Sequence, residues 1–169
     1  MQPRAWPLVQ RWIERAANAV TVLPPDAPPD QAALEALGLT ERSVLGALAV
    51  HTAGLVIDEG WLRVLGGATL LSWSDRLAGG LVVGHDAAGG FFAVVREDGE
   101  VRYLLPGGGE WVGTEMGHAA WVHWTLTGDL DSFYAEMREP GWQAQVAALE
   151  PDQGLTPGGP VPMADLWSP

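Results

Sequence analysis

The sequence predicts one α+β domain in which an antiparallel-dominated sheet is flanked by N- and C-terminal helices. Short apolar runs separated by turn residues, from 55 to 65 and from 81 to 105, indicate strands joined by hairpins. Segments with helical patterns stand before and after those runs. A chain of 169 residues buries one core well and is short for two. We therefore expect a globular domain over residues 1–150, with its sheet from about residue 55 to 112, and a Pro/Gly-rich C-terminal tail over 151–169 docked on it.

Three helices are expected before the sheet. Residues 7–20 open with a proline suited to a first helical position and place apolar side chains on one stripe. Asp30 is placed to cap a short helix that Gly38 ends, since glycine favours the left-handed conformation there. Residues 40–52 carry apolar side chains at helical spacing, and Gly54 terminates that pattern.

The longest apolar stretch, GGLVVGHDAAGGFFAVV over residues 79–95, is interrupted by glycines. A phosphate-binding loop needs glycines that lead into a helix N-terminus, whereas Gly89 and Gly90 lead into a strand-like run. The loop is therefore predicted to be a hairpin turn in which both glycines take a positive φ. Gly84, inside the first strand, predicts a bulge or a closely packed neighbour.

The C-terminal part is expected to be helical and then irregular. After the triple glycine at 107–109, helices are predicted over residues 116–128, 129–139 and 141–150. Trp142 is predicted to be a core residue. Beyond Glu150 the prolines and glycines argue against regular structure over most of the tail, while Leu166 and Trp167 are expected to dock it on the body.

Composition excludes several classes of enzyme. The chain has neither lysine nor cysteine, and all nine basic residues are arginine. Without an ε-amino group, Schiff-base chemistry, the phosphate-loop motif and the protein-kinase site are excluded. Without a thiol there is no disulfide, no thiolate nucleophile and no cysteine-containing zinc site. No cofactor is expected.

The charge of the chain favours one kind of partner. Its 21 acidic and nine basic residues give a net charge of −12, which repels nucleic-acid phosphates and anionic membrane surfaces. No nucleic acid and no membrane is therefore expected as a partner, and a basic protein is favoured. The sequence also lacks an apolar run of about 18 residues and a signal-peptide pattern, so a cytoplasmic location is expected.

No catalytic or metal-binding set emerges from residue spacing. His85 and Asp86 are neighbours in a strand, so they point to opposite faces and cannot serve one substrate. His118 and His123 are five residues apart on an expected helix, unlike the four-residue spacing that places two imidazoles over one metal. No serine stands in a G-x-S-x-G elbow, and no pair of acids is preferred over another.

The order of several motifs resembles one bacterial family. The motifs are, in chain order, LGALAVHTAGLVIDEGWLRVLGG, GGLVVGHDAAGGFFAV, GEVRYLLPGGGEW, WTLTGDLDSFYAEMREPGWQAQVAAL and VPMADLW. Together they cover almost the whole chain and resemble the domain-of-unknown-function family numbered 2625. The most specific residues are Gly128, Asp129, Leu130, Phe133, Tyr134, Arg138, Pro140, Gly141 and Trp142. The glycine-aromatic strand pair followed by G-E-V-x-Y is also remotely similar to the SUKH group, related to the yeast Smi/Knr regulators.

The SUKH resemblance implies an immunity protein that neutralises a toxin. With the acidity and the lack of a catalytic set, it makes a non-enzymatic protein-binding domain the first hypothesis, with a basic protein, such as a toxin domain, as partner. The candidate surface combines acids that cluster in sequence with one aromatic anchor: Glu97, Asp98, Glu100, Glu110, Trp111 and Glu115. Two alternatives stay open. One is a structural or regulatory scaffold that forms a homo-oligomer, and the other is an enzyme with paired carboxylates of displaced pKa.

Overall fold

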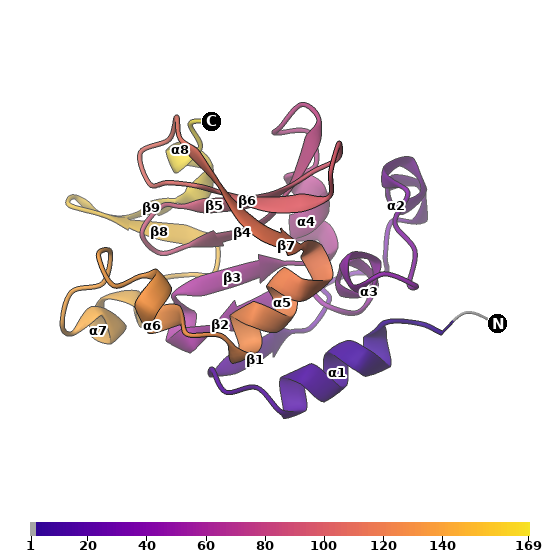
Figure 1. Cartoon of the computed structure of the whole chain (residues 1–169), viewed down its shortest axis with the longest axis horizontal. Coiled ribbons are helices and arrows are strands. Elements are labelled where there is room, and N and C mark those ends of the chain that lie inside the picture. The colour runs from indigo at the N-terminus through magenta and orange to yellow at the C-terminus, as the bar shows by residue number, and fades with distance from the viewer. Residues whose placement is uncertain (1–2) are drawn as a thin grey trace.

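The computed structural model describes residues 3–169 and shows an α+β protein built on one seven-stranded sheet (Figure 1). The strands are β1 (Val20–Leu23), β2 (Gly54–Ile57), β3 (Leu62–Leu65), β4 (Gly80–Asp86), β5 (Phe91–Val95), β6 (Glu100–Leu104) and β7 (Trp111–Gly117). Neighbouring strands are antiparallel and follow the order of the chain, which confirms the predicted fold class. A separate two-stranded sheet pairs β8 (Gln153–Thr156) with β9 (Gly159–Pro162).

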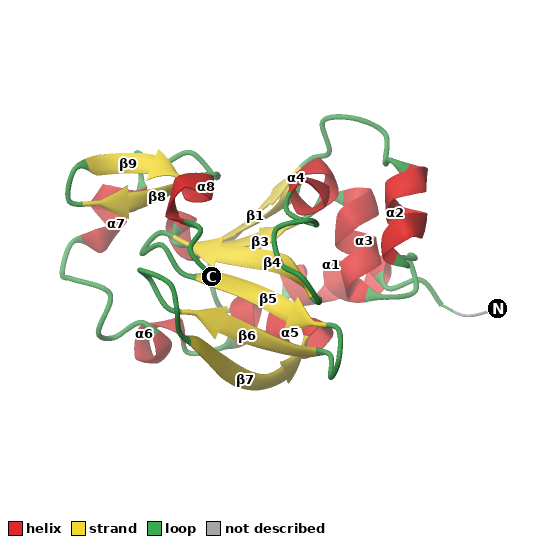
Figure 2. Ribbon diagram, turned by 90° about the horizontal axis from the view of Figure 1, so that it is seen from above, coloured by secondary structure: helices red, strands yellow, loops and turns green. Residues whose placement is uncertain are grey.

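Most of the helices gather at the two ends of the sheet. The helices are α1 (Trp6–Glu14), α2 (Gln31–Leu37), α3 (Val44–His51), α4 (Gly67–Ser72), α5 (His118–Thr127), α6 (Leu130–Phe133), α7 (Trp142–Val146) and α8 (Met163–Leu166). Figure 2 shows α1 to α4 at one end, and α6 to α8 with the β8–β9 hairpin at the other, whereas α5 lies against β6 and β7 (Figure 1). Among residues 3–169, no helix has the length and apolarity needed to cross a bilayer.

The sheet extends beyond the predicted residues 55–112, by one added strand on one side and by a longer last strand on the other. The helix expected over residues 7–20 ends at Glu14, and Val20–Leu23 forms β1, which pairs with β2. The prediction was wrong because three of these four residues are β-branched, and such side chains favour a strand. At the other side, Met116 belongs to β7 and not to the helix predicted over residues 116–128, so α5 begins at His118. The short helix α4 was not anticipated.

The C-terminal tail is more regular than predicted. The expectation of mostly irregular structure was wrong, because Gly159 at φ 112° permits the turn between β8 and β9. The tail is also held by Arg63 of β3, whose Nη1 donates a hydrogen bond of 2.6 Å to the carbonyl oxygen of Gln153. Leu166 and Trp167 are partly buried and pack against the core.

The turn between β4 and β5 confirms the predicted hairpin and corrects one detail. Gly89 has a φ of 96°, whereas Gly90 lies outside the left-handed region. Gly90 is required by close packing, because a Cβ there would lie 2.0 Å from the hydroxyl oxygen of Tyr103. Gly84 shows both predicted features: the β4–β5 register shifts beside it, and a Cβ would lie 2.6 Å from the ring of Trp121.

These two glycines should respond differently to substitution. We expect Gly90→Ala to lower the free energy of unfolding by about 2–3 kcal/mol, because the new methyl group displaces a buried tyrosine. Gly89→Ala should cost only about 1 kcal/mol, since it adds backbone strain without a close contact. Urea unfolding of the two variants measures the difference, and equal costs would contradict the packing role of Gly90.

Strand β4 contributes to the core on both faces of the sheet. His85 and Asp86 are both buried. His85 lies against Phe91, with ring centroids 6.2 Å apart, while the carboxylate of Asp86 accepts hydrogen bonds from Tyr103 and Tyr134. The predicted separation of these two side chains onto opposite faces is therefore confirmed.

Candidate functional site

The segment after α5 that carries the most specific part of the resemblance forms a buried cluster around Arg138. The guanidinium carbon of Arg138 lies 4.8 Å from the ring centroid of Trp61, 5.1 Å from that of Tyr134 and 4.2 Å from that of Trp142. Gly141 takes a φ of 86° and starts the turn into α7. Trp142 is only 8% exposed, which confirms that it is a core residue. The motif therefore packs the C-terminal helices against the sheet.

Ion pairs complete this cluster. Arg138 donates to the carboxylate of Asp58, in the turn between β2 and β3, and to Oδ1 of Asp131 at 2.8 Å. Asp58 has a φ of 56°, in the left-handed region that non-glycine residues seldom occupy. Asp129 caps α6 through a 3.0 Å hydrogen bond from the Ser132 amide. Each of these polar residues of the motif thus has a structural partner.

A second polar cluster surrounds the fully buried carboxylate of Asp86. Oδ2 accepts hydrogen bonds from the hydroxyls of Tyr103 at 2.6 Å and Tyr134 at 2.9 Å, and Oδ1 accepts one of 2.9 Å from the Gly90 amide. Burial raises the pKa of Asp86, while these hydrogen bonds and the charge of Arg63 act in the opposite direction. Burial and the nearby Asp86 raise the pKa of both tyrosines.

The Asp86 cluster holds one carboxylate, whereas the enzyme alternative needs two. Within residues 3–169 no second carboxylate is hydrogen-bonded to it. That described part of the chain also contains no group of three or more histidine, aspartate or glutamate residues that could hold a metal ion. The cluster ties β4 to β6 and to the segment after α6, because the acceptor Asp86 ends β4 while the two hydroxyl donors come from Tyr103 of β6 and Tyr134 after α6.

The structure divides the predicted partner surface between the two ends of the β6–β7 hairpin. Four of its members lie at one end and two at the other: Glu97, Asp98, Glu100 and Glu115, and then Glu110 with Trp111. The register establishes this, because Glu100 stands opposite Gly117 while Leu104 stands opposite Trp111. The six residues thus form two groups rather than one continuous patch.

Local contacts change the character of both groups. Arg102 donates to Asp98 Oδ2 at 2.6 Å and to Glu100 Oε1 at 3.1 Å, which partly neutralises the first group. Glu100 Oε2 also accepts a hydrogen bond of 2.9 Å from the amide of Glu115. Trp111 is half-buried and lies edge-on to Trp167, with centroids 6.3 Å apart.

An apolar groove lies next to these acids and was not anticipated. It has a volume of about 400 Å³ and is lined by residues of β6, β7, α5 and the α6 region: Tyr103, Leu105, Val112, Gly113, Thr114, Met116, Trp124, Phe133 and Met137. Val112 is 45% exposed and Phe133 is 38% exposed, the two highest fractions among the large apolar residues described. The two most exposed large apolar side chains thus line one groove.

The part of the sequence that supplies the lining residues of this groove is acidic. From Tyr103 to Met137 the sequence has no arginine or lysine, and it has five exposed acids: Glu110, Glu115, Asp129, Asp131 and Glu136. Strand β7 is the last strand of the sheet and pairs with β6 alone within the described chain. Its outer edge can therefore accept a further strand.

The sequence offered one usable signal for this site. The absence of basic residues between Arg102 and Arg138 is visible without a structure. The apolar part had no such signal, because Phe133 belongs to a helix whose exposed face is set by the packing of its neighbours Leu130 and Tyr134, both buried.

The chain is thus an α+β protein whose antiparallel strands follow the order of the sequence. It has a buried cluster around Arg138 and an apolar groove beside an edge strand. Residues 1–163 match the family model described as "Protein of unknown function DUF2625", and the chain belongs to this family. It is 35% identical over 167 residues to the "Putative uncharacterized protein YbfG" of Escherichia coli (strain K12), covering 90% of this chain and 77% of that protein.

A second relative is an "Uncharacterized protein" of Haemophilus influenzae (strain ATCC 51907 / DSM 11121 / KW20 / Rd). It is 27% identical over 168 residues, which cover 88% of this chain and 74% of the relative. No solved structure matches the chain.

Proposed function

We propose that this chain is a non-enzymatic protein-binding domain that takes a basic segment of a partner protein along β7. The observation that carries the proposal is the groove of about 400 Å³ beside an edge strand, all of whose lining residues come from a segment, Tyr103 to Met137, without a basic residue. The acids of this segment attract a cationic partner, and the exposed apolar side chains supply the area that stabilises the complex.

The edge strand favours an extended conformation for the bound segment. A strand added to β7 would satisfy the outer backbone groups of β7 and point every second side chain toward the same face. Apolar side chains on that face would contact Val112 and Phe133, and lysine or arginine side chains on the other face would approach Glu115 and its neighbours. Alternating basic and apolar residues therefore define the partner segment.

The proposal extends to a class of partner. We extend it to a basic toxin domain as the protein that carries this segment, on the remote resemblance of the glycine-aromatic strand pair to the SUKH group. The net charge of −12 supports fast association with such a domain, because long-range attraction raises the encounter rate.

A synthetic peptide tests the geometry directly. An end-blocked peptide of alternating lysine and valine should bind in calorimetry, and Val112→Asn with Phe133→Asn should weaken it at least about ten-fold, or about 1.4 kcal/mol. The matched control is Val22→Asn, since Val22 is 36% exposed on β1, the opposite edge strand. Equal binding of an alternating glutamate and valine peptide, or equal weakening by the control, would contradict the proposal.

The acids are tested by kinetics. The variant neutralises the five predicted acids to glutamine or asparagine: Glu97, Asp98, Glu100, Glu110 and Glu115. Its matched control neutralises five exposed acids elsewhere: Glu14, Asp26, Glu35, Asp75 and Asp165. At low salt the first variant should lose more on-rate for the lysine and valine peptide than the control, and salt near 0.5 M should remove the difference. Equal on-rates at low salt would rule out steering by these acids.

A further inference from the structure

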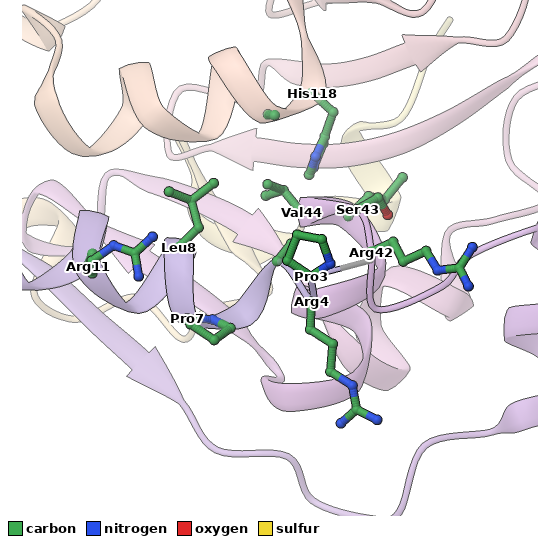
Figure 3. A pocket seen from close by; sticks show the side chains of 12 residues that line it. Pro3, Arg4, Pro7, Leu8, Arg11, Arg42, Ser43, Val44 and His118 are labelled. Carbon is green, nitrogen blue, oxygen red and sulfur yellow. The ribbon is translucent and has the colours of Figure 1, made fainter. Parts of the chain in front are cut away.

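A pocket at the N-terminal end of the fold differs in charge from the rest of the protein. It has a volume of about 720 Å³ and lies between the start of α1, the turn before α3 and the start of α5. Arg4, Arg11 and Arg42 line it, whereas no aspartate or glutamate does (Figure 3). One third of the arginines of a chain with net charge −12 therefore surround one pocket.

Two of these arginines are free to bind a ligand. Arg4 lies 3.8 Å from Glu41, a carboxylate that is also bonded to His51. Arg11 and Arg42 form no ion pair with any residue of the described range 3–169. Guanidinium groups that lack a carboxylate partner are suited to carboxylate and phosphate oxygens, which they bind in bidentate fashion.

Two helices direct their N-termini to the same pocket. Val44 and Leu45 start α3, and His118 and Ala119 start α5, and all four line the pocket. The N-terminus of α5 has no side-chain cap, so the pocket receives the positive end of a helix whose first amides lack a side-chain acceptor. Anions bind at such ends.

His118 supplies an independent observation. Its ring extends from α5 toward Ser43 and Val44, and both ring nitrogens are buried without a hydrogen-bond partner among residues 3–169 (Figure 3). Burial lowers its pKa to about 3, so the ring is neutral near pH 7 and holds one donor and one acceptor. Buried polar atoms are normally paired, so two unpartnered nitrogens indicate a place for a polar ligand atom.

We infer that this pocket binds a small organic anion, in which a carboxylate or phosphate group lies at His118 and the N-terminus of α5, with Arg11 and Arg42 on opposite sides of the pocket (Figure 3), and an apolar body lies against Leu8 and Val44. The apolar body is required by the remaining lining residues, which are mostly proline, alanine, leucine and valine. The volume falls in the range of small-molecule sites, about 300–1,000 Å³. This site is separate from the β7 groove, since the two share no lining residue.

Octyl phosphate, used below its micelle concentration, is a suitable probe. It should bind in calorimetry at least about ten-fold more tightly than either octanol or inorganic phosphate. Octanol lacks the anionic group, and inorganic phosphate lacks the apolar body. Binding should also shift the ring-proton resonances of His118 in NMR spectra. Equal affinity for inorganic phosphate, or binding that leaves the His118 resonances unchanged, would overturn the inference.

A charge-matched pair of variants locates the anion. Arg11→Gln with Arg42→Gln should weaken octyl phosphate binding at least about ten-fold. The control Arg15→Gln with Arg96→Gln removes the same charge from exposed positions outside the pocket and should change the affinity less than about two-fold. An equal loss of octyl phosphate affinity in the two double variants would overturn the proposed site. Sedimentation with phosphatidylglycerol vesicles in the absence of octyl phosphate binding would overturn it in favour of a lipid surface.

Discussion

Arg138→Leu is expected to lower the free energy of unfolding by about 3–4 kcal/mol, because it removes one partner of a nearly buried ion pair. The side chain of Arg138 is 4% exposed and contacts three aromatic rings as well as the carboxylate of Asp58. Leucine restores part of the apolar contact and none of the charge. Asp58 would then remain in a strained turn without its cation.

The two acids bound to Arg138 provide matched controls. The side chain of Asp131 is 89% exposed and that of Asp58 is 20% exposed. Asp131→Asn should therefore change the free energy of unfolding by less than about 1 kcal/mol, while Asp58→Asn should cost more. Arg138→Lys should fall between the wild type and Arg138→Leu, since an ammonium keeps the charge and lacks the planar fork. Urea unfolding gives all four values. An Arg138→Leu variant within 1 kcal/mol of the wild type would contradict the central role of this residue.

Asp86→Ala is expected to cost about 3–5 kcal/mol at neutral pH. The substitution leaves the hydroxyls of Tyr103 and Tyr134 and the amide of Gly90 without their acceptor in the core. Each orphaned donor costs about 1–3 kcal/mol, and relief from burying a carboxylate offsets part of the sum. Asp165→Ala, at an exposed position, is the control and should change little.

The cost of Asp86→Ala should also depend on pH in a defined direction. Burial raises the pKa of Asp86 in the folded protein above its ordinary value of 3.8. The folded state therefore binds a proton more readily than the unfolded state, so the stability that Asp86 contributes is lost as pH rises from 3.8 through the folded pKa. Acidification through this window should widen the gap between wild type and Asp86→Ala. A gap that narrows on acidification would refute the raised pKa.

Sequence alone determined the antiparallel meander, because strand pairing between neighbours depends on local signals. The Gly89 turn and the apolar runs beside it are contiguous, so their pairing could be predicted from a short window. Trp142 was recognisable as core for a similar reason, since it follows a proline-glycine turn that begins a helix. The sequence also showed the clustered acids of the candidate surface and the absence of lysine.

Only the tertiary structure decided which of those residues lie together. The register of β6 against β7 separates Glu110 from Glu100, although ten positions in sequence suggested one patch. The groove around Phe133 and the pocket around Arg11 and Arg42 combine residues from distant segments. Such sites depend on packing between segments that are far apart in the sequence, and local sequence patterns do not show which distant segments pack together. The same reason explains the tail, whose hairpin is held by Arg63, 90 residues before its acceptor.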